Sequence, residues 1–324
     1  MGKTLLLISE KEDDNTFAIE VAITAGLSLK RAKSPVEGAK LIAEEEITVI
    51  LADASSKEQF QALENAIQES VGLFSDKINS NAIHFISSDD LEDVEYLIKS
   101  PLFGHFILRN YQDPKKAGQH YGRIIKATVA ERAFGLANLL KPGAKVQVVK
   151  LGLTSQKNEA VEAIKTLLVT AKFQNRMASA IASAVDELLM NAMFDAPVDD
   201  MGKQKYAATL RSTILNLEGS AAVEMHVGYD GEYVAISAID NFGSLDKNKL
   251  LSHVSKMYAD SEYKVKTNVA GAGIGLAQVF RTGGSFFFVS ESRVRTEVTV
   301  FFKKTDSYKE FRNQFRFLST QFYF

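Results

Sequence analysis

Five short apolar runs alternate with amphipathic segments over the first 110 residues of the chain. Strands that alternate with helices form βαβ units, in which the strands lie parallel in one sheet. The connections are too short for anything but single crossovers. The expected strands are Thr4–Ile8, Leu27–Ala32, Ile47–Asp53, Ala82–Ile86 and Phe103–Leu108. The expected helices are Thr16–Ala25, Pro35–Glu45, Lys57–Ser70 and Glu92–Lys99.

One long helical pattern follows, from Lys115 to Leu140, and Pro142-Gly143 ends it. The second half combines helices with an antiparallel or mixed sheet, which is an α+β arrangement. We expect a first domain at 1–114, a connector helix at 115–143, a second domain at 144–305 and a tail at 306–324. The expected elements of the second domain are strands Val146–Leu151, Ala221–Tyr229, Tyr233–Asp240, Ser285–Ser290 and Arg295–Phe302, and helices Asn158–Lys172, Asn175–Phe194 and Lys247–Tyr258.

The composition excludes several classes of protein. Hydrophobic residues make up 46% of the chain, which rules out a disordered or fibrous protein. The 38 basic and 40 acidic residues nearly balance, so we expect no nucleic-acid partner and no attraction to an anionic membrane. The absence of cysteine excludes disulfides, thiolate metal sites and a cysteine nucleophile. Since no apolar run reaches the length of a membrane span or signal peptide, we expect a cytoplasmic protein.

The first chemically suggestive segment of the second half contains Glu187 and Asn191. They are four residues apart, so they share one face of a helix. The side-chain oxygen of an asparagine suits Mg²⁺, and a carboxylate one turn away can accept a proton from an attacking group. The alternative is an ordinary polar helix face.

Two further segments follow. Asp240 ends an apolar strand and precedes a turn, where its carboxylate can accept a hydrogen bond from an exocyclic amine such as that of adenine. The alternative is a helix N-cap or an Asx-turn. Alternating glycines at 271–275 leave backbone N–H groups free to converge on a phosphate before a helix. The alternative is a flexible turn, and the pattern fits neither the Rossmann fingerprint nor the P-loop.

In this order and at this spacing, the three segments resemble the GHKL ATPases, which include histidine kinases and anti-sigma-factor serine kinases. The resemblance covers roughly residues 144–304 and implies an α+β sandwich that binds ATP with Mg²⁺. It implies that Asn191 binds Mg²⁺, that Glu187 is the catalytic base and that Asp240 binds adenine. The other nucleotide-binding residues that it implies are Gly243, Gly271, Gly273, Ile274, Gly275, Leu276 and Thr296.

The chain departs from the family pattern at several positions. Phe242 and Ser244 replace two glycines of the turn after Asp240, Phe194 replaces a basic residue, and Arg295 replaces a glycine before Thr296. These changes affect catalytic speed more than nucleotide binding. The resemblance also implies a lid over ATP between Ser244 and Gly271, from which Lys264 and Lys266 could reach phosphates.

The first domain resembles a response-regulator receiver domain, which is a flavodoxin-like fold. The resemblance makes Asp53 the candidate phosphoacceptor and places Ser87 or Ser88 at the end of the fourth strand. Two acids after the first strand would hold Mg²⁺ in that family. The chain has Ser9 and Glu10 there, with Asp13 and Asp14 further on, and Arg109 or Asn110 where a lysine is expected. We therefore expect a pseudo-receiver.

These resemblances imply an ATP-dependent protein of two-component signalling, a kinase-type transferase that phosphorylates or regulates a partner protein. An autophosphorylating histidine kinase is disfavoured, because the connector offers one helix and only His120, which we expect at the surface. A non-catalytic, nucleotide-gated interaction module is the alternative function. A scaffold that binds no nucleotide would require the motifs to be coincidental.

The C-terminal tail has an aromatic pattern. Phe311, Phe315, Leu318 and Phe322 are spaced by four, three and four residues, which predicts a helix with one apolar stripe. We expect this stripe to pack against the second domain of its own chain. The alternative is packing against a second subunit, which would make the protein a homodimer.

Overall fold

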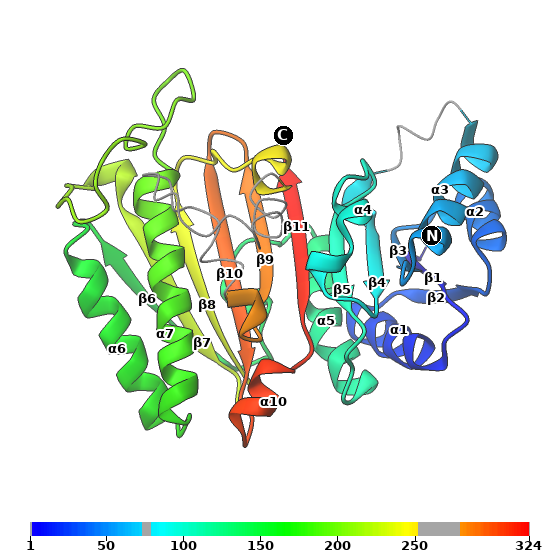
Figure 1. Cartoon of the computed structure of the whole chain (residues 1–324), viewed down its shortest axis with the longest axis horizontal. Helices are drawn as coiled ribbons and strands as arrows, with labels where there is room; N and C mark the ends of the chain where they lie inside the picture. Colours follow the sequence, from blue (N-terminus) through cyan, green and yellow to red (C-terminus); the bar gives the residue numbers. More distant parts are fainter. Residues whose placement is uncertain (1, 73–78, 252–278, 324) are drawn as a thin grey trace. The chain divides into compact units, whose positions relative to one another are not determined.

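The computed structural model describes residues 2–72, 79–251 and 279–323. The chain forms two compact units, which Figure 1 shows coloured along the sequence. Unit 1 comprises residues 1–133 and 315–320, and unit 2 comprises residues 134–314 and 321–324.

Unit 1 contains a sheet of five parallel strands in the order β2-β1-β3-β4-β5. The strands β1 and β3–β5 are almost wholly buried, as their continuous apolar runs predict for a sheet covered on both faces. Doubly wound sheets of this order bind ligands at the carboxyl ends of their strands. The strands are β1 (Thr4–Ile8), β2 (Ser28–Ala32), β3 (Val49–Asp53), β4 (Ile83–Ser87) and β5 (His105–Leu108), so all five predicted strands are present.

The helices of unit 1 pack in pairs, α1 with α5 and α2 with α3. Gly118 and Gly122 on α5 allow a close approach to α1. A Cβ atom at Gly118 would lie 2.5 Å from the backbone oxygen of Phe17, and one at Gly122 would lie 2.7 Å from Cβ of Thr24. The helices are α1 (Glu12–Ala25), α2 (Pro35–Glu44), α3 (Lys57–Val71), α4 (Glu95–Ile98) and α5 (Pro114–Val129).

The predicted connector helix from Lys115 to Leu140 is wrong. Helix α5 ends at Val129, Glu131 adopts a positive φ of 55°, and the following residues lead across the boundary between the two units. The short 3₁₀ helix η4 (Leu136–Asn138) already belongs to unit 2, where the leucines at 136, 139 and 140 are buried. The spacing of apolar residues alone does not distinguish one long helix from two shorter segments that are buried in different units. The prediction that His120 lies at the surface is also wrong, because this residue is only 1% exposed.

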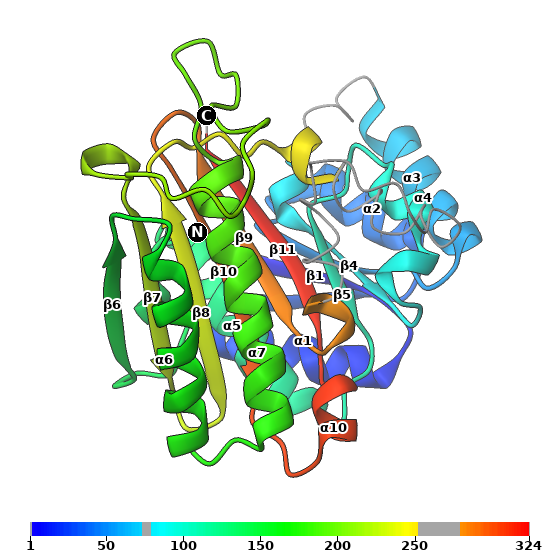
Figure 2. The ribbon, with the colours of Figure 1, turned by 60° about the vertical axis from the view of Figure 1, so that its left-hand side comes forward.

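Unit 2 contains a sheet of antiparallel strands in the order β9-β10-β8-β7-β6. Two helices, α6 (Gln156–Thr170) and α7 (Asn175–Met190), lie side by side over one face of it (Figure 2). Unit 2 is therefore a two-layer arrangement of helices on an antiparallel sheet, with its five expected strands and the first two expected helices in place. The expected helix Lys247–Tyr258 begins at Lys247, but its part after Leu251 lies outside the described residues. The strands are β6 (Lys145–Leu151), β7 (Val223–Tyr229), β8 (Tyr233–Asp240), β9 (Ser285–Glu291) and β10 (Arg295–Lys303).

The predicted helix Asn175–Phe194 is α-helical only as far as Met190. After Met190 the chain continues as a π-helical turn, η5 (Asn191–Asp195), in which the N–H of Ala196 donates to the carbonyl of Asn191. The combined helix Asn175–Asp195 is, among the described residues, the one helix long and apolar enough to cross a bilayer. Since 67% of its most apolar window is buried inside the fold, it fits a core helix.

The predicted helix in the C-terminal tail is wrong. Only the short helix α10 (Tyr308–Arg312) forms, and strand β11 (Phe317–Tyr323) follows it. Phe311 stays in unit 2 and stacks on Phe302, whereas the first half of β11 pairs antiparallel with β5 of unit 1. The tail therefore does pack against its own chain, but residues 315–320 do so in the N-terminal unit. Its aromatic and β-branched residues favour a strand, and burial on both faces hides the alternation that would reveal one.

Removing the tail is predicted to destabilise unit 1. Truncation after Gln314 exposes the surface on which Phe317 and Leu318 are buried, which costs about 3–6 kcal/mol. We expect a lower melting temperature at every protein concentration and faster amide exchange in β5. The variant Ser319→Ala is the control, because it removes only the hydrogen bond to the Tyr121 hydroxyl, worth about 1 kcal/mol. Unchanged exchange at residues 105–108 in the truncated chain would contradict the prediction.

Candidate functional site

Three residues predicted to bind nucleotide line one cavity of unit 2. Asn191, Asp240 and Thr296 come from the π-helical turn after α7, from β8 and from β10, and they line one open-sided cavity. Apolar side chains supply most of its remaining wall. The other lining residues are Leu188, Ala192, Asp195, Ala196, Gln204, Ala238, Ser244, Leu245, Lys249, Leu250, Phe288 and Val298. An apolar cavity with a few convergent polar groups is the usual form of a small-molecule site.

Two residues of the π-helical turn line this cavity. They are Asn191 and Asp195, four residues apart. The Oδ1 atom of Asn191 is buried and has no hydrogen-bond partner among the described residues. Asp195 pairs with Arg211 at 2.9 Å. Such turns occur frequently at functional sites, and Asn191 presents an unused acceptor here.

Asp240 is a buried acid at the end of β8. It is 5% exposed and lies opposite Thr296 of β10 in the sheet register. The backbone N–H of Phe242 donates to its Oδ1 at 2.9 Å. Burial raises the pKa of Asp240 to about 7, although hydrogen bonds from Phe242, Gly243 and Thr296 act in the opposite direction. Near neutral pH this carboxyl therefore changes readily between proton donor and acceptor.

Gly243 lies at a neighbouring position. It does not line the cavity of Asn191, Asp240 and Thr296, but one beside it that includes Ser290 and Arg293. Its φ is 54°, and a Cβ atom would lie 2.0 Å from the backbone oxygen of Glu291. Gly243 is therefore required by the turn, which also supplies an N–H group to Asp240.

Glu187, which lies on α7 one turn before Asn191, lines different cavities. It lines two open cavities, one toward α6 and one toward Arg176 and Tyr308, and not the cavity that holds Asn191. Its Oε1 atom is buried without a partner among the described residues, and burial raises its pKa. A raised pKa suits a proton acceptor, but the structure does not bring Glu187 to the same cavity as the other predicted residues.

Several predicted site residues lie outside the described part of the chain. They are Gly271, Gly273, Ile274, Gly275 and Leu276, together with Lys264 and Lys266 of the expected lid.

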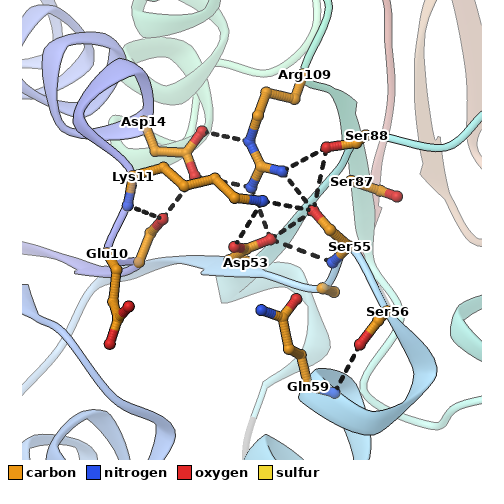
Figure 3. Close-up of polar contacts among 12 residues, drawn as sticks. Glu10, Lys11, Asp14, Asp53, Ser55, Ser56, Gln59, Ser87, Ser88 and Arg109 are labelled. Atoms are coloured by element: carbon orange, nitrogen blue, oxygen red, sulfur yellow. Dashed lines mark hydrogen bonds and ion pairs between the residues drawn. The ribbon is translucent and has the colours of Figure 1, made fainter.

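A second cluster of polar side chains gathers in unit 1, beyond the carboxyl ends of β1, β3 and β5 (Figure 3). We call it the Arg109 cluster, and its members are Lys11, Asp14, Asp53, Ser55, Ser88 and Arg109. The guanidinium of Arg109 contacts Asp14 at 2.8 Å and Asp53 at 2.6 Å. Asp14 is fully buried, whereas Glu10 points away from the cluster in Figure 3 and Asp13 is exposed.

The candidate phosphoacceptor Asp53 is heavily engaged in this cluster. Burial raises its pKa, but hydrogen bonds from Ser55, Arg109 and Lys11 outweigh it and leave the pKa below its ordinary value. Ser88 accepts a hydrogen bond from Arg109 at 2.7 Å, whereas the hydroxyl of Ser87 accepts one from the backbone of Asp89. Of the two residues considered for the position of the expected lysine, Arg109 contacts Asp53.

Sequence reasoning missed several residues of these sites, Lys11 and Ser55 of the Arg109 cluster among them. Asp195 follows Asn191 by four residues, a spacing that would have placed it on the same helical face. Asp14 was noted only as an acid further along, because its burial is not visible in the sequence. Lys249 lines the unit 2 cavity and donates to the carbonyl of Ser244, and no pattern in the sequence marks it.

Comparison with models of known protein families finds none that matches this chain, and comparison with curated protein sequences finds no match either.

The pKa of Asp240 leads to a prediction about stability. Its folded pKa, about 7, exceeds the usual 3.8, so the folded state binds more protons between these values. Stability therefore falls as pH rises through this range, by roughly 4 kcal/mol at most. Asp240→Asn removes the charge, so its melting temperature relative to wild type should rise from pH 5 to pH 8, measured without nucleotide.

The control for this experiment is Asp306→Asn, at an exposed position of unit 2. Its melting temperature should follow that of wild type at both pH values. A difference between Asp240→Asn and wild type that does not depend on pH would show that Asp240 does not titrate in this range.

Proposed function

We propose that unit 2 binds ATP in the cavity of Asn191, Asp240 and Thr296, and that the protein is an ATP-dependent signalling protein of the cytoplasm. The observation that carries this proposal is the convergence of these residues, which are far apart in sequence, on one cavity. Both the motif order in the sequence and the shared cavity support the proposal. In this proposal the adenine ring lies against apolar lining side chains such as Leu188 and Val298, and Asp240 accepts a hydrogen bond from its exocyclic amine.

The cavity also suits the Mg²⁺ that accompanies ATP. The unpartnered Oδ1 of Asn191 and the carboxylate of Asp195 are oxygen donors of the kind that Mg²⁺ prefers. In this proposal these two residues hold the ion, which supplies charge neutralisation for the phosphates. Thr296 is a hydroxyl donor at the same cavity.

The proposed activity is phosphoryl transfer to, or ATP-dependent regulation of, a partner protein, with unit 1 as a receiver-like regulatory domain. Phosphoryl transfer needs mainly positioning and charge neutralisation. Glu187 is the proposed base, and its raised pKa and unpartnered oxygen support that role.

A second candidate function has an observation in its favour. Glu187 lines different cavities from Asn191, so a group bound beside Asn191 does not share a cavity with it. This arrangement favours a module that binds ATP and changes its interaction surface without catalysis. Product formation distinguishes the two functions.

ATP binding is tested by calorimetry with Mg²⁺. Wild type should bind ATP, and Asp240→Asn should bind it about 10- to 100-fold more weakly, because an amide can present a donor where the carboxylate accepts. Asp306→Asn, an exposed substitution of the same kind, should bind as wild type does. Equal affinity of Asp240→Asn and wild type would remove Asp240 from the site.

Catalysis is tested with Glu187→Gln. If Glu187 is the base, this variant should keep its ATP affinity and lose turnover or transfer by at least about 100-fold. Glu159→Gln, at an exposed position of α6, is the matched control and should be fully active. A folded Glu187→Gln protein that no longer binds ATP would contradict this role, and a wild type that binds ATP without turnover would support the gated module.

A further inference from the structure

The Arg109 cluster lies where a parallel sheet of this order ordinarily binds its ligand, at the carboxyl ends of the strands. Two carboxylates that lie close together at such a position attract a divalent cation, because Mg²⁺ prefers carboxylate oxygens. The receiver-like character proposed for unit 1 likewise implies a magnesium ion. The contacts of their four carboxylate oxygen atoms decide whether Asp14 and Asp53 are available to bind a magnesium ion.

One nitrogen atom already bridges the two carboxylates. Nη2 of Arg109 lies 2.8 Å from Oδ2 of Asp14 and 2.6 Å from Oδ1 of Asp53. Nε of Arg109 donates to the other oxygen of Asp14 at 2.8 Å, so that this pair is bidentate. The bridging nitrogen therefore stands where an ion shared by both acids would have to lie.

The remaining oxygen of Asp53 is engaged as well. Its Oδ2 contacts Nζ of Lys11 at 3.1 Å, and its Oδ1 also accepts hydrogen bonds from the backbone and hydroxyl of Ser55. All four carboxylate oxygens of the two acids thus have donors. An oxygen of Asp53 that would attack a phosphoryl group would first have to give up a cationic partner.

The charges of the cluster are balanced without a metal. Two carboxylates face one guanidinium and one ammonium, and the side chains of Asp14, Asp53 and Arg109 are at most 10% exposed. A divalent cation added here would lie beside the guanidinium in a partly desolvated place, where repulsion is strong. The residues present therefore do not fit a magnesium ion.

We propose that the guanidinium of Arg109 takes the place of a divalent cation in unit 1, so that Asp14 and Asp53 are permanently neutralised and the unit needs neither metal nor phosphorylation of Asp53. Arg109 also donates to Ser88 after β4 and contacts Ser55 after β3. The Arg109 side chain, from the end of β5, thus links the segments that follow β1, β3 and β4. Its contact after β1 is with Asp14, in the first turn of α1. Arg109 is a positioning residue that holds these loops in one arrangement. This inference concerns unit 1 alone and does not depend on nucleotide binding by unit 2.

Metal dependence of the melting temperature tests the proposal, with the full-length chain and no nucleotide. Wild type should melt at the same temperature in EDTA and in excess Mg²⁺. Arg109→Ala leaves two carboxylates unpaired and should melt roughly 10 °C lower in EDTA, and Mg²⁺ should restore part of that loss. Arg109→Lys keeps a cation and should not respond to Mg²⁺. It provides the comparison if Arg109→Ala fails to fold.

Lys99→Ala is the control. Lys99 lies in the same unit and its ion pair with Glu95 is exposed, so its loss should lower the melting temperature by much less and produce no response to Mg²⁺. Direct binding of Mn²⁺, followed by its electron paramagnetic resonance signal, provides a second measurement. A wild-type Mn²⁺ site that disappears in Asp53→Asn would overturn the proposal, as would a wild-type melting temperature that rises with Mg²⁺.

Phosphorylation gives an independent readout. Acetyl phosphate with Mg²⁺ should leave Asp53 of wild type unmodified in a phosphate-affinity gel, because the oxygens of Asp53 are held by Arg109, Lys11 and Ser55. Asp53→Asn should migrate in the same way as wild type. A retarded band in wild type that Asp53→Asn abolishes would overturn the proposal.

Discussion

A buried carboxylate is costly unless a cation, a proton or hydrogen bonds compensate its charge, and the two units meet this constraint differently. In unit 1, Asp14 and Asp53 share the guanidinium of Arg109, which balances both and organises the loops around them. In unit 2, Asp240 has no cationic partner among the described residues, and burial raises its pKa to about 7. The charges of the Arg109 cluster are balanced by its own residues, whereas only hydrogen bonds and a proton compensate the charge of Asp240. This difference supports the proposal that the ligand of the protein binds in unit 2.

The geometry of the unit 2 cavity follows from backbone features. The register of β8 and β10 sets Asp240 opposite Thr296, and the turn after Asp240 is closed by Gly243, where no side chain fits beside Glu291. The hydroxyl of Ser244 then donates to the carbonyl of Ala196, just beyond the π-helical turn. This bond ties the turn after β8 to the end of the helix that carries Asn191. A side chain from each of three elements is thereby held at one cavity.

Much of the secondary structure could be predicted, because period and composition are local signals. The five strands of unit 1 and the hairpins of unit 2 were visible as apolar runs bounded by turn residues. The predictions failed for the segment at 130–140 and for the tail. In both places apolar residues at helical spacing are buried in different surroundings, with Leu136 and Leu140 in unit 2, and Phe315 and Leu318 in unit 1. Periodicity reports which residues are buried, not what buries them.

The sequence by itself determined which residue types stand at the strand ends and on α7, and hence that Asn191, Asp240, Thr296 and Asp53 are candidates. It could do so because the carboxyl end of a strand and one face of a helix are set by the local backbone. Only the tertiary structure decided which candidates meet: it joined Asn191, Asp240 and Thr296 at one cavity, left Glu187 at others, and set Arg109 between Asp14 and Asp53. Those outcomes depend on strand register, on a π-helical turn and on charge neutralisation between residues about 95 positions apart. Such non-local relations arise only when the folded chain brings these groups together and removes them from water.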